Sequence, residues 1–392
     1  MSISIGLAGK PNSGKSTFFK AATLANVEIA DHPFTTIDAN HGVTYVRVKC
    51  PCESIGTPCG QCQNGARYVP VEIIDVAGLV PDAHKGRGLG NAFLDNLSRV
   101  NAIIHVIDAS GGTDIEGNTV GIAQHDPVED IEFLEHEIAM WMFGILKRNW
   151  NRLSRRIQAE GLKVERIISE QLQGVGVTDH QAKTALMQTG LLDSNPAIWT
   201  DEEMIVLCEA LRRESKPLII AANKMDIAPP ELMERLVSVD RIVVPISAAA
   251  ELALRMAAKS GVIDYRAGDK EFTITGELND AQEAALGKIR DLLNKNGNTG
   301  IQKCINTAVL ELLNQIVAYP VEDENKLTDK NGKKLPDAFL MKCGSTPHDL
   351  AYMVHTDIGE GFLYAINAKT KMRMGEKHEL EDGDVVKITS TK

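Results

Sequence analysis

The sequence lacks any apolar run as long as the ~18–20 residues that a membrane helix needs, so no membrane span is expected. It also lacks a basic N-terminal region with a cleavage site, so no signal peptide is expected and the chain is predicted to be cytoplasmic. There is no excess of basic residues, since the net charge is −11. Proteins that bind polyanions regardless of sequence are usually basic, so that class is disfavoured, although the total charge says nothing against a local basic patch.

The length and composition are those of a soluble globular protein. At about 100–200 residues per domain, 392 residues correspond to roughly two to four domains with ample material for a core. Apolar residues make up 43% of the chain and charged residues 24%, both ordinary values. The seven cysteines lie in a large chain without a signal peptide, which argues against a disulfide framework.

Short apolar runs alternate with helical patterns through most of the chain. The first run, Ile3–Ala8, ends at a glycine loop that is followed by a predicted helix, Lys15–Leu24. Such alternation is typical of an α/β fold with a parallel, doubly wound sheet. The further strands predicted on this basis are Val43–Val48, Val69–Asp75, Ala102–Asp108, Pro217–Ala222 and Arg241–Ile246.

The stretch 127–199 interrupts this alternation. It has no convincing strand, begins with acidic residues that suit a helix N-terminus, and continues with apolar residues at helical spacing. We expect a helical hairpin, resembling a coiled coil, inserted into the sheet domain. The sheet domain then consists of residues 1–126 and 200–276.

Two helices and a small domain are predicted beyond the sheet. The helices, which form a connector over 277–316, are Asn279–Asn296 and Ile301–Ile316. The C-terminal domain, 317–392, is predicted to be α+β, and Thr346, Pro347 and Asp349 have the pattern of a capped helix start. Its predicted strands are Phe362–Asn367 and Val385–Thr389.

Residues 9–16 read G-K-P-N-S-G-K-S, which is the pattern of a phosphate-binding loop between a strand and a helix. Glycines allow the backbone N–H groups of such a loop to surround phosphates at the helix N-terminus. Lys15 is expected to reach the β- and γ-phosphates and to act in catalysis, and Ser16 is expected to ligate Mg²⁺. The other residues expected to contact the nucleotide here are Gly9, Asn12, Ser13, Gly14 and Thr17.

Two further segments are expected to meet the γ-phosphate and the metal. Asp75 ends a predicted strand and begins D-V-A-G, so its carboxylate can reach Mg²⁺ through water while the Gly78 N–H approaches the γ-phosphate. The segment D-H-P-F-T-T lies earlier in the chain, in the position of a switch segment. Either Thr35 or Thr36 would then bind Mg²⁺, and the alternative is an ordinary loop.

The sequence N-K-M-D follows another predicted strand and has the chemistry to recognise guanine. The Asp226 carboxylate can accept hydrogen bonds from guanine N1–H and the exocyclic amine, whereas adenine has neither donor. Lys224 would pack along the base, and Asn223 would tie the surrounding loops together. Ser247 and Ala248 follow the next strand, where the Ala248 N–H is expected to contact guanine O6. Together the motifs predict GTP or GDP with Mg²⁺ as ligands.

The order of these motifs resembles the Obg-like family of translation-associated GTPases, and within it the YchF-type branch in its archaeal form. The matching segments are G-K-P-N-S-G-K-S-T, H-P-F-T-T-I-D-A-N, D-V-A-G-L-V, A-H-K-G-R-G-L-G-N and N-K-M-D. The C-terminal segments G-S-T-P-H-D-L-A and H-E-L-E-D-G-D-V-V resemble a TGS domain, a ubiquitin-like β-grasp module. The resemblance covers nearly the whole chain. It implies a P-loop NTPase fold with a helical insertion and a TGS domain, both of which contact the ribosome or RNA.

The chain has two notable departures. Many YchF-type proteins lack the lysine and aspartate of N-K-x-D and prefer ATP, and because this chain has both residues, GTP is predicted. Ras-like proteins place a water-orienting glutamine after D-x-x-G, where this chain has Leu79, so slow intrinsic hydrolysis is expected. The candidates for another catalytic group are Asn12, acting through a bound K⁺, and the loop residues His84, Lys85 and Arg87.

Four of the cysteines, Cys50, Cys52, Cys59 and Cys62, lie within one short, turn-rich loop. Four thiols in such a loop can converge on a tetrahedral Zn²⁺, and the alternatives are free thiols or a redox pair. The remaining cysteines are scattered and are expected to be core packing residues: Cys208, Cys304 and Cys343.

A basic stretch lies in the helical insertion and comprises Lys147, Arg148, Arg152, Arg155, Arg156, Lys163 and Arg166. Within an acidic chain it is either a solvated helical face or a contact with a phosphate backbone, in particular that of ribosomal RNA. The sequence therefore predicts a GTP-hydrolysing protein of the translation-factor class that acts as a ribosome- or RNA-associated switch. The alternatives are a YchF-type ATPase and a nucleotide-state sensor with negligible turnover.

Overall fold

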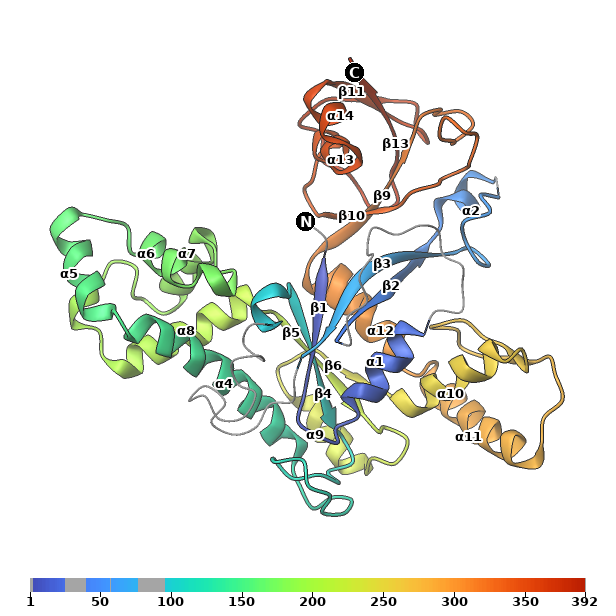
Figure 1. Ribbon diagram of the computed structural model, residues 1–392, viewed down its shortest axis with the longest axis horizontal. Helices are drawn as coiled ribbons and strands as arrows, with labels where there is room; N and C mark the ends of the chain where they lie inside the picture. Colours follow the sequence, from blue (N-terminus) through green and yellow to red (C-terminus); the bar gives the residue numbers. More distant parts are fainter. Residues whose placement is uncertain (1–2, 25–39, 57, 77–95, 392) are drawn as a thin grey trace. The chain divides into compact units, whose positions relative to one another are not determined.

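The computed structural model describes residues 3–24, 40–56, 58–76 and 96–391, and Figure 1 shows the arrangement of its elements. The chain divides into two compact units. The first unit comprises Met1–Thr44 and Glu72–Cys304, and the second comprises Tyr45–Val71 and Ile305–Lys392. The sequence predicts residues 45–71 as part of the nucleotide domain, whereas in the structure they cluster with the C-terminal domain.

The first unit is built on a sheet with the strand order β2-β3-β1-β4-β5-β6. The pairs β1–β3, β1–β4, β4–β5 and β5–β6 are parallel, which confirms the predicted parallel α/β sheet. Every residue of β1, β4 and β5 is buried, as expected of central parallel strands. The strands are β1 Ser4–Ala8, β2 His41–Lys49, β3 Ala66–Asp75, β4 Ala102–Asp108, β5 Leu218–Asn223 and β6 Val243–Pro245.

Helices pack around this sheet, and α4 contacts β4 while α1 contacts α10. The helices of the first unit are α1 Lys15–Thr23, α4 Pro127–Lys147, α5 Trp150–Glu160, α6 Val164–Gln171, α7 Asp179–Gln188, α8 Asp201–Ser215, α9 Pro230–Ser238, α10 Ala248–Lys259 and α11 Asp280–Asn296. A short antiparallel pair, β7 Ile263–Asp264 and β8 Thr273–Ile274, lies between α10 and α11 in the chain.

The predicted helical region at 127–199 is confirmed, but it is more than a hairpin. All of this stretch is described, and it contains α4 to α7 with two short 3₁₀ turns, Gln173–Val175 and Pro196–Ile198. Most of its buried apolar side chains belong to the same core cluster as β4, β5 and α8, while Leu153, Ile157 and Ile167 form a small cluster of their own. Trp150 stacks on Trp199 with ring centroids 5.2 Å apart. A coiled coil would bury one narrow seam, whereas these helices form a globular bundle against the sheet.

The connector helix ends earlier than the sequence predicts. Helix α12 spans Ile301–Asn306 and continues as a π-helical turn, Thr307–Leu312, after which strand β9 begins at Gln315. Asn314 has a φ of 50°, a left-handed conformation that asparagine tolerates and that terminates helices. The apolar spacing of this segment continues into the strand, which is why the pattern alone placed the helix end too late.

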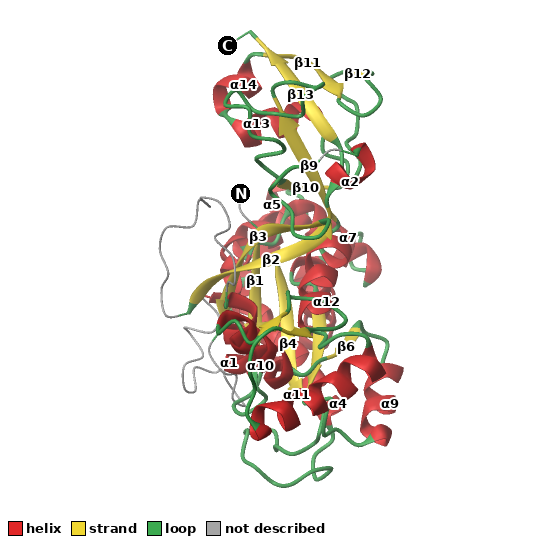
Figure 2. Ribbon diagram, turned by 90° about the vertical axis from the view of Figure 1, so that its right-hand side faces the viewer, coloured by secondary structure: helices red, strands yellow, loops and turns green. Residues whose placement is uncertain are grey.

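The second unit contains a mixed sheet with the order β10-β9-β13-β11-β12, in which β9 and β13 are parallel and the other pairs antiparallel. Its strands are β9 Gln315–Val321, β10 Phe339–Lys342, β11 Phe362–Asn367, β12 Arg373–Met374 and β13 Val385–Ser390. Helices α13 Pro347–Val354 and α14 Thr356–Glu360 contact β13, as Figure 2 shows. The residues at 45–71 add helix α2, Pro51–Ile55.

Helix α13 begins with the predicted capping box. The Thr346 Oγ1 accepts a hydrogen bond from the Asp349 N–H at 3.2 Å, and the Asp349 carboxylate accepts one from the Thr346 N–H at 2.8 Å. Leu350 of the same helix is fully buried among residues of the sheet. The cap therefore fixes the helix that closes this core.

Replacing Thr346 with alanine should loosen α13, because one N–H of the first turn loses its acceptor. A lost cap costs about 1 kcal/mol, so amide hydrogen exchange across Pro347–Val354 should accelerate roughly fivefold where it proceeds by local opening. The control is Thr356→Ala, an exposed threonine in the same unit. Equal exchange rates in Thr346→Ala and the parent protein would show that the cap does not stabilise the helix.

Candidate functional site

The loop between β1 and α1 approaches the ends of two neighbouring strands so closely that two of its positions exclude any side chain. Gly14 caps α1 with a φ of 94°, and a Cβ there would lie 2.1 Å from Asn223 Nδ2. A Cβ on Gly9 would lie 2.4 Å from the carbonyl oxygen of Val106 in β4. Both positions therefore require glycine, and the loop rests directly on β4 and β5.

The side chain of Asn223, the last residue of β5, connects three segments. Its Nδ2 donates to the Ser13 carbonyl at 2.8 Å, and its Oδ1 accepts from the Ala248 N–H at 3.0 Å. Asn223 is buried, so both bonds are shielded from water. The amide thus holds the phosphate loop, the N-K-M-D segment and the start of α10 together, in the arrangement that the sequence predicts for this residue.

The start of α10 differs in one respect from the prediction. The Ala248 N–H, expected to contact guanine O6, donates to Asn223. Ser247 caps the helix, since its Oγ accepts from the Ala250 N–H at 3.3 Å. The contact between Ala248 and guanine therefore stays a prediction.

The ammonium of Lys224 binds a buried carboxylate that sequence reasoning missed. Its Nζ lies 2.8 Å from Asp108 Oδ2, at the end of β4. Ser110 Oγ donates to the other oxygen at 2.6 Å, and Thr113 Oγ1 donates to Oδ2 at 3.1 Å. Burial alone would raise the pKa of Asp108, but the hydrogen bonds from Lys224 and Ser110 outweigh it, and the pKa is lowered from 3.8. The carboxylate is therefore ionised at neutral pH and fixes the lysine.

A signal for Asp108 was available in the sequence. It is an acidic residue at the carboxyl end of an otherwise apolar parallel strand, the edge at which α/β sheets bind ligands. The apolar residues of this segment predict the strand but not a role for its last residue.

Asp226 is exposed, unlike Asn223 and Lys224 of the same motif. Within the described ranges it makes no hydrogen bond or ion pair. Asn223 and Lys224 are thus anchored to the protein, while Asp226 remains accessible to a ligand.

The charged groups expected at the phosphates and the metal also meet. The Lys15 ammonium forms an ion pair with Asp75 and donates to the Val76 carbonyl at 2.5 Å. Ser16 is exposed at the start of α1, and the buried Ser13 Oγ has no hydrogen-bond partner among the described residues. The other residues predicted for this site lie outside the described residues: Thr35, Thr36, Gly78, Leu79, His84, Lys85 and Arg87.

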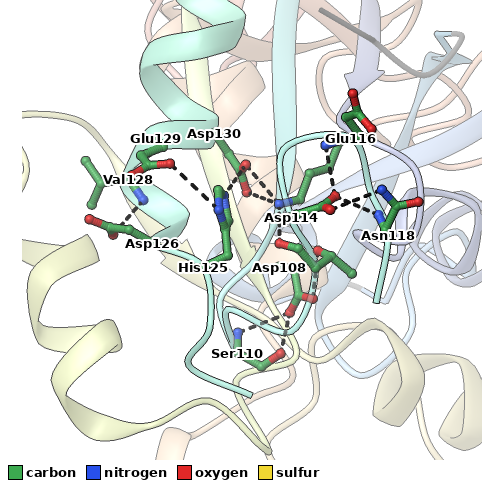
Figure 3. A network of polar contacts seen from close by, with 12 residues as sticks. Asp108, Ser110, Asp114, Glu116, Asn118, His125, Asp126, Val128, Glu129 and Asp130 are labelled. Carbon is green, nitrogen blue, oxygen red and sulfur yellow. Dashed lines mark hydrogen bonds and ion pairs between the residues drawn. The ribbon is translucent and has the colours of Figure 1, made fainter. Parts of the chain in front are cut away.

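A second buried ion pair joins the phosphate loop to the start of α4. The Lys10 ammonium, almost fully buried, donates to the Thr113 carbonyl at 2.8 Å and lies 2.9 Å from Asp130 Oδ1. The His125 Nε2 lies 2.9 Å from the same oxygen, and Figure 3 shows His125 beside Asp130 and Glu129. Sequence reasoning gave neither Lys10 nor Asp130 a role. The phosphate loop is therefore held from the helical bundle as well as from β5.

Asn12 contacts the loop that follows β4. Its Nδ2 donates to the Gly117 carbonyl at 3.0 Å, and this loop is itself stabilised by bonds from Asn118 to the Asp114 carboxylate, visible in Figure 3. Asn12 has a φ of 61°, which asparagine tolerates. The expected role of Asn12 beside a K⁺ ion is not tested by this contact.

The cysteines of the chain fall into two groups. Those predicted to converge do so, in the second unit, with the Sγ atoms of Cys50, Cys52, Cys59 and Cys62 all within 4.8 Å of one another. Cys208 and Cys304 are buried as expected, whereas Cys343 is exposed, so its assignment to a core was wrong.

Three segments of the chain match known families. Residues 4–140 match the family described as 50S ribosome-binding GTPase, residues 221–323 match the Obg-like GTPase YGR210-like, G4 motif-containing domain, and residues 327–390 match the TGS domain. A GTP-binding protein of Methanocaldococcus jannaschii is 49% identical, over 98% of each chain. This chain belongs to the Obg-like family of P-loop GTPases. The predicted family, fold class and binding of guanine nucleotide are thereby confirmed.

Two further proteins are similar to this Obg-like GTPase over nearly its whole length. The crystal structure of a GTP-binding protein from Pyrococcus horikoshii covers 100% of both chains, with a TM-score of 0.79 and 42% identity. The protein of Homo sapiens named Obg-like ATPase 1 is 28% identical, over 98% of this chain and 91% of its own. No helix among the described residues is long and apolar enough to cross a membrane.

Replacing Asn223 with alanine should weaken nucleotide binding, because the Ser13 carbonyl and the Ala248 N–H both lose their partner in a buried place. An unsatisfied buried group costs about 1–3 kcal/mol, so the affinity for GDP should fall at least about tenfold by calorimetry. The matched control is Asn151→Ala, an exposed asparagine of α5. Unchanged affinity in Asn223→Ala would contradict the bridging role.

Proposed function

We propose that this Obg-like protein binds GTP in preference to ATP, hydrolyses it slowly, and acts as a nucleotide-dependent switch. The observation that carries the proposal is the contrast within N-K-M-D. Asn223 and Lys224 are fixed by buried partners, while the Asp226 carboxylate is exposed and unengaged by any described residue. A carboxylate held on a preorganised loop can accept from guanine N1–H and the exocyclic amine without first ordering the loop. Adenine would leave it without a donor.

The phosphate side of the site supports the same proposal. Lys15 is positioned to exchange its contact with Asp75 for the β- and γ-phosphates. Ser13 Oγ, which has no hydrogen-bond partner among the described residues, offers a further polar group. The hydroxyl of Ser16 and, through water, the carboxylate of Asp75 would hold Mg²⁺. The metal would neutralise the charge that develops on the phosphates. The residues present therefore suit a magnesium nucleotide.

The switch itself would involve residues outside the described ranges. We propose that the γ-phosphate and Mg²⁺ order Thr35 or Thr36 and the Gly78 loop, and that hydrolysis releases them. Because leucine cannot orient a water molecule, Leu79 is expected to keep intrinsic hydrolysis slow. Candidates for assistance are His84, and a K⁺ ion beside Asn12. The nucleotide domain in this scheme is 1–126 and 200–276 without residues 45–71, which cluster with the C-terminal domain.

Base recognition is tested by calorimetry with non-hydrolysable GTP and ATP analogues in the presence of Mg²⁺ and K⁺. We expect the GTP analogue to bind at least about 100-fold more tightly, which corresponds to about 2.7 kcal/mol. In Asp226→Asn the preference should collapse, because an amide can no longer accept from both guanine donors. The control is Asp240→Asn, an exposed aspartate of the same unit.

Two results would contradict the proposal. Equal or tighter binding of the ATP analogue by the parent protein would favour a YchF-type ATPase. Tight GTP binding with no measurable phosphate release, even with K⁺ or ribosomes, would favour a nucleotide sensor without turnover.

We further propose that the helical bundle contacts RNA, in particular ribosomal RNA. Of the basic residues there, Lys147, Arg156 and Arg166 pair with Asp201, Glu160 and Glu170, respectively. The other four basic residues of this stretch are exposed and form no ion pair with any described residue: Arg148, Arg152, Arg155 and Lys163. Arg152 and Arg155 lie three residues apart on α5, and Arg148 lies in the turn between α4 and α5. These charges support a contact with a phosphate backbone.

Replacing Arg148, Arg152 and Arg155 together with glutamine should reduce the affinity for ribosomes and flatten its dependence on salt. Each phosphate contact that is lost lowers the slope of log K against log salt by about 0.7–0.9. The control is Arg156→Gln together with Arg166→Gln, which removes charges already neutralised by glutamates. Salt-independent binding of the parent protein, or an equal effect of both variants, would argue for a merely solvated helical face.

A further inference from the structure

The loop that joins β2 to β3 gathers four thiols into one small volume. The Sγ atoms of Cys50 and Cys59 are 3.7 Å apart, those of Cys52 and Cys62 are 3.5 Å apart, and all four lie within 4.8 Å of one another. Among the described residues, no other group of histidine, cysteine or acidic side chains has this arrangement. Four cysteine thiolates are a ligand set of tetrahedral structural zinc sites.

The spacing of the sulfurs fits a single tetrahedral ion. A Zn–S bond of about 2.3 Å places the thiolates at the corners of a tetrahedron about 3.8 Å apart. An iron–sulfur cluster distributes its thiolates over several irons and would separate them further. The separations of 3.5 and 3.7 Å are close to the single-ion value, and all the other pairs lie within 4.8 Å.

The loop is built to hold the four thiols in place. The Cys50 N–H donates to the Gly65 carbonyl at 2.8 Å, and Gln63 and Ala66 exchange two backbone bonds of 2.9 Å. Pro51 occupies the first turn of α2, directly after Cys50. The Gln61 N–H donates to Cys59 Sγ at 3.3 Å, the kind of outer contact that stabilises a metal-bound thiolate.

The surroundings indicate a closed, structural site. Cys50, Cys52 and Cys59 are buried and Cys62 is half-buried, in an apolar cluster with Val69, Val317, Tyr319 and Val385. Tyr319 Oη is buried without a hydrogen-bond partner among the described residues. With four protein ligands, no coordination position is left for a substrate.

We propose that Cys50, Cys52, Cys59 and Cys62 bind one structural Zn²⁺ that fixes the 45–71 segment into the core of the second unit. The cysteines of this segment lie in the same apolar cluster as residues of β9 and β13. Arg67 adds two hydrogen bonds, to the Leu335 and Pro336 carbonyls at 3.0 and 2.8 Å. The metal would give this loop a single conformation. The role is independent of the proposed GTP specificity.

The test is the metal content of the full chain purified under reducing conditions without chelator. We expect about one equivalent of zinc per chain, and uptake of Co²⁺ into the chelator-stripped protein with the visible bands of a tetrahedral thiolate complex. Cys59→Ser combined with Cys62→Ser should abolish both signals. Cys343→Ser is the matched control, since it removes an exposed cysteine of the same unit, and it should retain both.

Three outcomes would overturn the proposal. These are reduced parent protein that contains no zinc and takes up no Co²⁺, iron as the principal metal, or disulfides joining the four cysteines under reducing purification. If the double variant fails to fold, the metal content and Co²⁺ spectrum of the parent protein still decide. Nucleotide affinity is measured in parallel, so failure of the zinc site is distinguishable from failure of GTP binding.

Discussion

The nucleotide site depends on one buried side-chain amide, that of Asn223. It can reach both the Ser13 carbonyl and the Ala248 N–H because β5 is buried along its whole length and ends at the edge where the phosphate loop crosses. The same closeness explains the requirement for glycine at position 14, where a Cβ would collide with the amide nitrogen. A change in any of these segments therefore displaces the others, and the base and phosphate halves of the site act as one rigid structure.

Two ion pairs with buried carboxylates hold the loops of this site in place, Lys224 with Asp108 and Lys10 with Asp130. Asp108 is completely buried but receives hydrogen bonds from Lys224, Ser110 and Thr113, and so remains charged. Lys10 is also buried, and its ammonium donates hydrogen bonds to Asp130 and to the Thr113 carbonyl. Removing one partner of such a pair is costly, because the other charge is left in a place with little water. These pairs fix the loops in position, while Asp226 stays exposed for the ligand.

Much of this arrangement was predictable from the sequence. The strands of the six-stranded sheet and the capping box at Thr346 follow from local patterns, and the glycine-lysine and N-K-M-D motifs indicate the ligand because their chemistry is local. The contact of Lys10 with Asp130 is brought about by tertiary packing, which no local spacing reveals, whereas Asp108 has a local signal as the acidic residue that ends an apolar strand. For a similar reason the sequence predicts a helical hairpin at 127–199 where the structure has a globular bundle of α4 to α7, since periodicity indicates helices but not how they pack. Convergence of the cysteines was suggested by their spacing, but their membership of the second unit was visible only in the fold.

The most direct test of the proposed site is a crystal structure of the protein with a non-hydrolysable GTP analogue and Mg²⁺. We predict that the Asp226 carboxylate accepts from guanine N1–H and the exocyclic amine, with the bond from Asn223 to the Ser13 carbonyl unchanged. Lys15 should leave Asp75 and contact the β- and γ-phosphates. A base bound away from Asp226, or phosphates bound while Lys15 remains paired with Asp75, would contradict the account.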